Sequence, residues 1–204
     1  MKIIIFGGTG DLGKIITKKL IEKNQNICIL SRQPLNSNEH LQYVTGNVLD
    51  IEAVKKCINE GDRVIVALGF NNSDIDTMSR GTNNVITAMK DKNCKRLICV
   101  SAQGAGDSWD YMPNEFKEMV LNDQILKASF KDHGIQEKLV MQSQLEWTIV
   151  RPTEIIDADE TRSYSINTIT ENSTFQISKY DVAAFIVNEL FEKKYLRQVA
   201  MITN

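Results

Sequence analysis

The stretch IIIFGGTGDLG, residues 3–13, decides the fold expected for this chain of 204 residues. Residues 3–6 form an unbroken apolar run that is short and rich in β-branched side chains, as parallel strands covered on both faces are. A cluster of glycines follows at once. Apolar and lysine residues then take separate faces across residues 14–23, which predicts an amphipathic helix. The sequence therefore predicts a strand, a tight glycine turn and a helix in direct succession.

The glycine turn gives the first expectation about function. Glycines let the backbone approach a pyrophosphate, and the free N–H groups and dipole at a helix start favour its negative charge. The alternative is an ordinary glycine turn, but the strand and helix that the phosphate motif requires are both present. We therefore expect a dinucleotide to bind here. The predicted contacts are Gly7, Thr9, Gly10, Asp11, Leu12 and Gly13.

The end of the second predicted strand, residues 26–30, indicates which cofactor is bound. Ser31 and Arg32 stand where an Asp or Glu would bind the ribose 2′-OH of NAD. The planar, permanently charged guanidinium of arginine suits the 2′-phosphate of NADP, and Thr9 and Ser31 offer hydroxyl donors to the same phosphate. The alternative is that Arg32 is a solvated loop charge. We expect NADPH to be preferred over NADH.

The rest of the chain alternates strands and helices, which is typical of a doubly wound α/β fold. We expect a single NAD(P)-binding domain over residues 1–204, a Rossmann fold with a mainly parallel sheet. Residues 164–177 alternate polar and β-branched side chains around Glu171-Asn172, which predicts a small C-terminal hairpin on the substrate side, outside the main sheet. Helical sequence from about residue 113 to 144 is expected to break at Gly134. Further strands are expected at residues 42–46, 63–68, 96–100, 147–150 and 198–202, and further helices at 51–58, 82–90 and 178–190.

Composition and charge exclude several classes of function. A net charge of −2 and a pI near 5.8, without a basic cluster, argue against nucleic-acid binding. No apolar stretch has the length of a membrane span. Met1-Lys2 leads directly into a structural strand, so we expect no signal peptide and a cytoplasmic location. The four cysteines lack C-x-x-C spacing, which favours buried thiols over metal ligands, and no metal is expected.

Several motifs, in this order and spacing, resemble one known family across nearly the whole chain. The chain is similar to the atypical short-chain dehydrogenase/reductases, in particular the NAD(P)H-binding flavin reductase/biliverdin reductase B group and its NmrA-like relatives. Its G-x-x-G-x-x-G spacing is the variant used by short-chain dehydrogenases. The motifs are GGTGDLG from residue 7, VSAQGAGDS from 100, KDHGIQEKL from 131, WTIVRP from 147 and ISKYDVAAF from 177.

This resemblance implies a reaction and a set of contacts. The reaction is hydride transfer from NADPH to a flat conjugated acceptor such as a flavin, a quinone or a linear tetrapyrrole. Most members carry an Asp where Asn47 stands, and Asn can still accept from the adenine amine. The implied contacts are Asn47 and Val48 with the adenine, Ala67, Leu68 and Gly69 with the adenosine ribose, and backbone groups of Pro152 and Thr153 with the nicotinamide carboxamide.

The Tyr-x-x-x-Lys pair of typical short-chain dehydrogenases is missing, because none of the five tyrosines has a lysine four positions later. Ketone reduction by that pair is therefore not expected. Ser101 occupies the superfamily's serine position beside the nicotinamide, and His133 stands where extended members carry the catalytic lysine. We expect both to be catalytic, and Ser101 also to contact the cofactor. The alternatives are a strand-end cap for Ser101 and a half-exposed helix residue for His133.

Two functions remain open from the sequence. One is an NADPH-dependent reductase with a small aromatic or conjugated substrate. The other is a non-catalytic NADP(H)-binding redox sensor that acts through a protein partner. A nucleotide-sugar epimerase usually needs the missing pair and a larger C-terminal substrate domain. The expected oligomeric state is a monomer or a homodimer, and the loop with Gln103, Trp109, Tyr111 and Met112 is a candidate floor for an aromatic-binding cleft.

Overall fold

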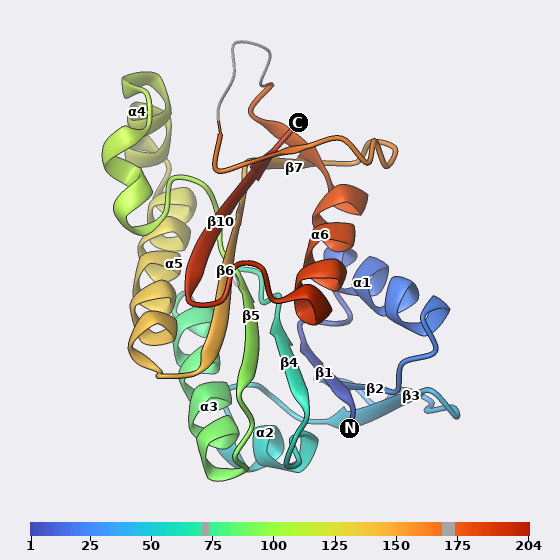
Figure 1. Cartoon of the computed structure of the whole chain (residues 1–204). Helices are drawn as coiled ribbons and strands as arrows, with labels where there is room; N and C mark the ends of the chain where they lie inside the picture. The colour runs from blue at the N-terminus through green and yellow to red at the C-terminus, as the bar shows by residue number, and fades with distance from the viewer. Residues whose placement is uncertain (71–73, 169–173) are drawn as a thin grey trace.

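A computed structural model describes residues 1–70, 74–168 and 174–204. Its main sheet has eight strands in the order β3-β2-β1-β4-β5-β6-β10-β8, and all neighbouring pairs are parallel except β10 with β8 (Figure 1). This is the expected doubly wound Rossmann arrangement. The strands are β1 (Ile3–Phe6), β2 (Ile27–Ser31), β3 (Leu41–Thr45), β4 (Arg63–Val66), β5 (Arg96–Val100), β6 (Glu146–Pro152), β8 (Ser165–Ile166) and β10 (Gln198–Thr203).

Helices cover both faces of this sheet (Figure 1). Helices α2 (Ile51–Cys57), α3 (Thr77–Asp91) and α5 (Gln124–Gln142) lie on one face, and α1 (Asp11–Glu22) and α6 (Lys179–Glu192) lie on the other. Strand β1 is fully buried. Ile4 and Phe6 pack in the core on the side of α2, α3 and α5, and Ile3 and Ile5 pack in the core on the side of α1 and α6. Alternate side chains of one strand therefore serve two cores, which explains why the run has no polar residue.

The long helical segment breaks earlier than the sequence predicts. Helix α4 (Asn114–Asn122) ends before Asp123, whose carboxylate caps α5 by accepting from the N–H groups of Ile125 and Leu126 at 2.8 and 3.0 Å. The expected break at Gly134 is wrong, because α5 continues through it. Gly134 faces the short helix η1 (Gly106–Tyr111), and a Cβ there would make an ordinary contact, 3.5 Å from the nitrogen of Gly106.

The expected C-terminal hairpin is also wrong in its pairing. Strand β8 pairs antiparallel with β10 at the edge of the main sheet, whereas β9 (Gln176–Ser178) pairs in parallel with β7 (Glu154–Ile156). The predicted turn around Glu171-Asn172 lies outside the described residues. Alternation of side chains shows that a segment is extended, but it does not name the neighbour that satisfies its backbone groups.

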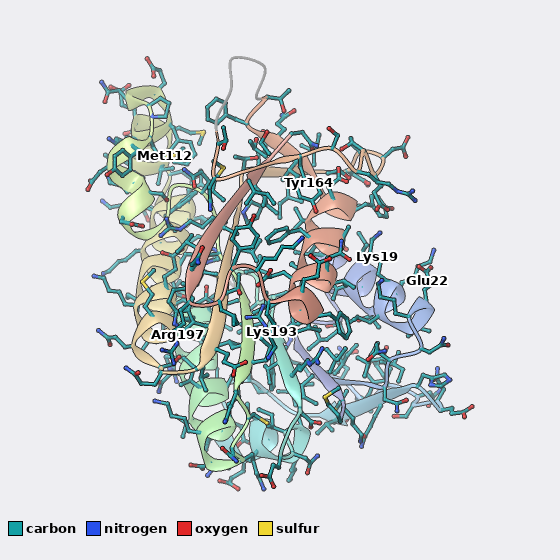
Figure 2. The ribbon with its side chains drawn as sticks, viewed as in Figure 1. Lys19, Glu22, Met112, Tyr164, Lys193 and Arg197 are labelled. Atoms are coloured by element: carbon teal, nitrogen blue, oxygen red, sulfur yellow. The ribbon has the colours of Figure 1, made fainter. Side chains whose placement is uncertain are left out.

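The two ends of the sheet differ in their surroundings. Lys193 binds Glu146, and Arg197 binds the carbonyl of Leu145, so both lie at the amino end of β6. Figure 2 shows them far from Met112 and Tyr164, which lie toward the other end. The loops that follow β1 to β6 gather at that carboxyl end, where ligands bind in open α/β sheets. All four cysteines are buried, as expected, and no helix of the described ranges could cross a membrane.

Candidate active site

The glycine turn connects β1 to α1, and each of its three spaced glycines has a different environment. Gly7 has a φ of +91°, and a Cβ there would lie 2.1 Å from the carbonyl oxygen of Ala67. A Cβ at Gly13 would lie 2.2 Å from the carbonyl oxygen of Gly7. The protein's own backbone therefore requires glycine at both positions. Among residues 1–70, 74–168 and 174–204, the only neighbour within 4 Å of a Cβ at Gly10 is the Gly7 oxygen, at 3.4 Å.

Gly10 is also the N-cap of α1, and it has no side chain to satisfy the first N–H groups of the helix. Its own N–H donates to the carbonyl of Gly7 at 3.1 Å, which closes the turn. Uncapped N–H groups and the helix dipole together favour an anion at this point. The free space beside Gly10 and the uncapped helix start are what a pyrophosphate requires.

A cavity of about 360 Å³ opens beside this turn, where the carboxyl ends of β1, β2, β3 and β4 meet. The strand order reverses between β1 and β4, so this is the switch point at which nucleotides bind in such sheets. Nine of the residues predicted to contact the cofactor line the cavity. They are Gly7, Thr9, Gly10, Arg32, Asn47, Val48, Ala67, Leu68 and Gly69.

Other lining residues could not be found from sequence patterns. Phe70 and Asp74 line the cavity from the segment between β4 and α3, which has no recognisable spacing, and Thr77 lines it from the first position of α3. Asp74 brings a carboxylate, and its closest cation is Arg80 at 3.4 Å. The remaining lining residues, Phe6, Leu30, Gly46 and Leu49, belong to strand ends or follow them directly.

Arg32 and Ser31 have different places at the end of β2. Arg32 is exposed and lines the cavity, as a ligand for a phosphate must. Ser31 is buried, and its hydroxyl donates to the carbonyl of Gln33 at 2.7 Å while it also accepts from the Gln33 N–H. That hydroxyl organises the turn that carries Arg32, and it does not line the cavity.

Asn47 is oriented by its own backbone. Its side-chain oxygen accepts from the N–H of Leu49 at 3.0 Å, and its carbonyl accepts from the N–H of Asp50 at 2.9 Å. The carbonyl of the next residue, Val48, accepts from the side-chain amide of Asn84 on α3. These bonds hold the segment after β3 against the cavity without using the Asn47 amide nitrogen.

The second group of predicted residues lies at the ends of β5 and β6. Ser101 follows β5 and donates its backbone N–H to the carbonyl of Val150 at 2.8 Å. Its side chain is only 4% exposed, and its hydroxyl has no hydrogen-bond partner among the described residues. Buried hydroxyls are normally paired, so the Ser101 hydroxyl at the carboxyl end of β5 is a candidate contact for a ligand.

His133 lies on α5, half-buried, with its Nδ1 atom 3.0 Å from the side-chain oxygen of Gln136. Burial lowers its pKa below the ordinary value of 6.5, although the contact with Gln136 and the nearby carboxylates of Glu137 and Asp132 oppose that shift. His133 is therefore neutral near pH 7. The position therefore fits the alternative of a half-exposed helix residue, which contacts the buried Gln136 of the same helix.

Pro152 and Thr153 are held within the sheet. The carbonyl of Pro152 accepts from the N–H of Gln103, and the N–H of Thr153 donates to the carbonyl of Ile202 at 3.0 Å. The Thr153 amide is therefore not a free donor for a carboxamide. Neither residue, nor Ser101 or His133, lines the cavity beside the glycine turn.

A buried ion pair supports the same end of the sheet. Arg151 of β6 donates from Nε and a terminal nitrogen to both carboxylate oxygens of Glu137, at 2.8 and 2.6 Å, and also binds Asp107 of η1. Removing one partner of such a pair leaves an uncompensated buried charge. Arg151 therefore connects α5, through Glu137, and the loop after Ser101, through Asp107, to β6. Among the described residues, no group of three His, Cys, Asp or Glu side chains is placed to hold a metal ion.

The loop after Ser101 carries the aromatic residues expected at a substrate cleft. Trp109 packs edge-on to Phe116, with ring centroids 6.4 Å apart, and Phe116 packs edge-on to Phe130 at 5.4 Å. Trp109 and Phe130 line a second cavity of about 760 Å³ between η1, α4 and α5. Tyr111 is 87% exposed, and the Gln103 amide lies 3.9 Å from the Met112 sulfur.

Comparison with known proteins agrees with this geometry. The model of the NAD(P)H-binding family matches residues 7–193. The chain belongs to the NAD(P)H-binding family. A curated relative, the inverting UDP-N-acetylglucosamine 4,6-dehydratase of Campylobacter jejuni, is 32% identical over 122 residues, which cover 50% of this chain and 36% of the relative. The chain thus spans about a third of the length of the curated relatives it matches.

Solved structures share the fold at low identity. ChuY of Escherichia coli O157:H7, described as an anaerobillin reductase, superposes with a TM-score of 0.84 at 19% identity, covering 99% of this chain and 96% of that one. A short-chain dehydrogenase/reductase of Veillonella parvula in complex with NADP has a TM-score of 0.79 at 18% identity, covering 100% and 94%. The family match makes this an NAD(P)H-binding chain, so the cofactor class is a nicotinamide dinucleotide, and the solved structures share its fold.

Proposed function

We propose that this protein is an NADPH-dependent reductase that transfers a hydride to a flat conjugated acceptor, such as a flavin, a quinone or a linear tetrapyrrole. The observation that carries the proposal is the cavity at the ends of β1 to β4, with Gly10 open toward it and Arg32 at its edge. A guanidinium at the end of β2 favours the 2′-phosphate of NADPH over the bare ribose hydroxyl of NADH.

The chain's own residues divide the work of binding and orientation. The N–H groups at the start of α1 hold the pyrophosphate, and Arg32 holds the 2′-phosphate. Asn47, Val48, Ala67, Leu68 and Gly69 enclose the adenosine half. The unpaired hydroxyl of Ser101 binds at the nicotinamide end, between β5 and β6. When bound, NADPH supplies the hydride.

The absence of the Tyr-x-x-x-Lys pair from the sequence supports the choice of a conjugated acceptor. In the Tyr-x-x-x-Lys pair the tyrosine stands one helical turn before the lysine, and the residue one turn before His133 on α5 is Ser129. A carbonyl substrate needs a proton donor of that kind. A flavin or another conjugated acceptor can take its proton from solvent, so that positioning is the main demand on the enzyme. ChuY, which shares the fold, is itself described as an anaerobillin reductase, which supports testing linear tetrapyrroles among the acceptors.

The test is an oxidation assay followed at the nicotinamide absorbance, with purified protein, NADPH and a panel of flavins, quinones and linear tetrapyrroles. We expect turnover with at least one acceptor class, and none in a Gly10→Val control that cannot hold the pyrophosphate. NADPH affinity is measured separately by titration. Tight NADPH binding without oxidation by any acceptor would contradict the reductase proposal and favour a redox sensor.

A further inference from the structure

A chain of three side chains connects α5 to α3 beside the predicted catalytic histidine. Gln136 on α5 is fully buried, and its side chain lies between His133 and Thr82. Its oxygen is 3.0 Å from Nδ1 of His133, and its amide nitrogen donates to the hydroxyl of Thr82 at 2.9 Å. Thr82 lies on α3 and is also fully buried.

We propose that Gln136 is a positioning residue that holds His133 with its proton on Nδ1, so that Nε2 is a hydrogen-bond acceptor for the bound ligand. This deepens the proposed function and rests on it only in placing His133 beside a ligand. A carbonyl oxygen of an amide only accepts, so the His133 nitrogen that contacts it must donate. Neutral imidazole carries one N–H, and its other nitrogen then has the free lone pair.

The surroundings of the two helices keep this arrangement in place. The carboxylate of Asp132 accepts from the backbone N–H of Met78 at 2.9 Å and of Ser79 at 3.3 Å, at the start of α3. This bond ties α5 to α3 one turn before Gln136 meets Thr82. The register between Gln136 and Thr82 is therefore set by a second, independent contact.

Charged groups around His133 do not supply a competing partner for Nδ1. The carboxylates near the ring are Asp132 and Glu137, both on α5. Asp132 is engaged with the backbone of α3, and Glu137 is paired with Arg151 of β6, which also binds Asp107 of η1. Burial disfavours the doubly protonated ring and lowers its pKa. The neutral ring with Nδ1–H is the form that these contacts select.

The chemical consequence concerns the acceptor. A neutral His133 that offers a lone pair at Nε2 is not a proton donor, and it matches a ligand that presents an N–H or O–H. Flavins and linear tetrapyrroles carry ring N–H donors, whereas quinones present carbonyl oxygens. Among the proposed acceptors, those with an N–H are favoured. Removing the His133 ring is then expected to lower kcat/KM more for flavins or linear tetrapyrroles than for quinones.

Nitrogen NMR of protein labelled with ¹⁵N-histidine tests the proposal directly, because the chain has only two histidines, His40 and His133. A His40→Gln variant assigns the signals. At neutral pH we expect the Nδ1–H tautomer of His133 to exceed the Nε2–H tautomer by roughly fivefold or more, the factor that one net hydrogen bond supplies. Predominance of the Nε2–H tautomer would overturn the proposal.

Three variants separate positioning from a structural role. Gln136→Leu removes the amide oxygen and is expected to lower the ratio of Nδ1–H to Nε2–H tautomer by about fivefold, because the hydrogen bond that stabilises Nδ1–H is lost. Gln142→Leu, at an exposed position of the same helix, is the matched control and is expected to leave it unchanged. Gln136→Glu keeps an oxygen acceptor and is expected to preserve Nδ1–H while raising the pKa of His133.

The variants also keep the result interpretable. If Gln136→Leu fails to fold, the wild-type tautomer and Gln136→Glu still decide the question. An unchanged tautomer ratio in folded Gln136→Leu would contradict the role of Gln136. Because the NMR measurement needs no turnover, an Nδ1–H tautomer in a protein that oxidises no NADPH would reject the reductase proposal while leaving the role of Gln136 intact.

Discussion

The two halves of the sheet's carboxyl end are built in different ways. At the ends of β1 to β4, the cavity is lined mainly by residues at or just after the strand ends, among them four glycines and the exposed Arg32. At the ends of β5 and β6, the important groups are buried side chains from distant segments, including Ser101, Gln136 and the Arg151–Glu137 pair. The first half is built from residues close to one another at the strand ends, whereas the second depends on a network that positions a few side chains.

The largest expected effect comes from the glycine turn, where Gly10 and Gly13 can be compared. Gly10→Val fills the space beside the α1 start, so we expect NADPH affinity to fall by about 100-fold or more, as loss of several hydrogen bonds to a charged group does. The fold should persist, because a Cβ at Gly10 meets only one backbone atom, at 3.4 Å. Cofactor titration and thermal unfolding measure the two effects.

Gly13→Val is the matched variant. A Cβ there would lie 2.2 Å from the Gly7 carbonyl oxygen, so we expect a clear loss of thermal stability as well as binding. Unchanged NADPH affinity in folded Gly10→Val protein would break the distinction between a glycine that the ligand requires and one that the fold requires.

The next largest effect is expected at Arg32, which lines the cavity at the ends of β1 to β4. Arg32→Ala is expected to weaken NADPH binding by about 10- to 100-fold, the range for hydrogen bonds to charged groups, and to leave NADH binding nearly unchanged. The reason is that the guanidinium meets only the 2′-phosphate. Titration of both cofactors into both proteins checks this. Equal losses for NADPH and NADH would show that Arg32 does not bind that phosphate.

The same contrast explains how much the sequence could predict. The predicted cofactor contacts of this half directly follow strands β1 to β4, and the structure brings nine of them to one cavity. Local pattern suffices there, because the strand, turn and helix are neighbours in the chain. The network of the second half joins Thr82 to Gln136 and Asp107 to Arg151, and no spacing in the sequence shows such pairs.

Other wrong predictions from the sequence also concern contacts between segments that are distant in the chain or that a local pattern does not show. The Asp123 cap was missed because the expected helix ran through it, and the arms of the expected hairpin pair with β10 and β7 instead of with each other. Ser178 and Asp181 stand three positions apart, which is the spacing of a capping box with Asp in place of Glu. Ser178 does cap α6 by accepting from the N–H of Tyr180, but the Asp181 carboxylate binds Thr161 and the backbone N–H of Arg162.

His133→Ala tests the second half of the site. We expect turnover to fall by only about tenfold, because His133 positions the ligand and does not donate the proton. Loss of a dedicated general acid would cost on the order of 10² to 10⁴. The pH profile gives an independent measurement. The pKa of folded His133 is below 6.5, so the acceptor form predominates above that pH and is lost as the ring protonates at lower pH. We expect wild-type activity to fall on that acid side, and the step to disappear in His133→Ala. A thousandfold loss would instead make His133 the proton donor.

The smallest expected effect is that of Ser101→Ala. Its hydroxyl is buried and unpaired among the described residues, so removing it should leave the thermal stability of the free protein unchanged or raised. NADPH affinity should fall about fivefold, as expected for one neutral hydrogen bond. Unfolding curves with and without NADPH measure both quantities. A destabilised free protein with unchanged affinity would show that Ser101 is a strand-end cap.

The central claim is that the cavity at the ends of β1 to β4 holds NADPH for hydride transfer. The most direct measurement is the oxidation of NADPH and of NADH, side by side, by the wild type and Arg32→Ala with the best acceptor of the panel. The account predicts wild-type turnover with a kcat/KM about 10- to 100-fold higher for NADPH, and loss of that preference in Arg32→Ala. Equal use of both cofactors by the wild type, or no oxidation of either with any acceptor, would contradict it.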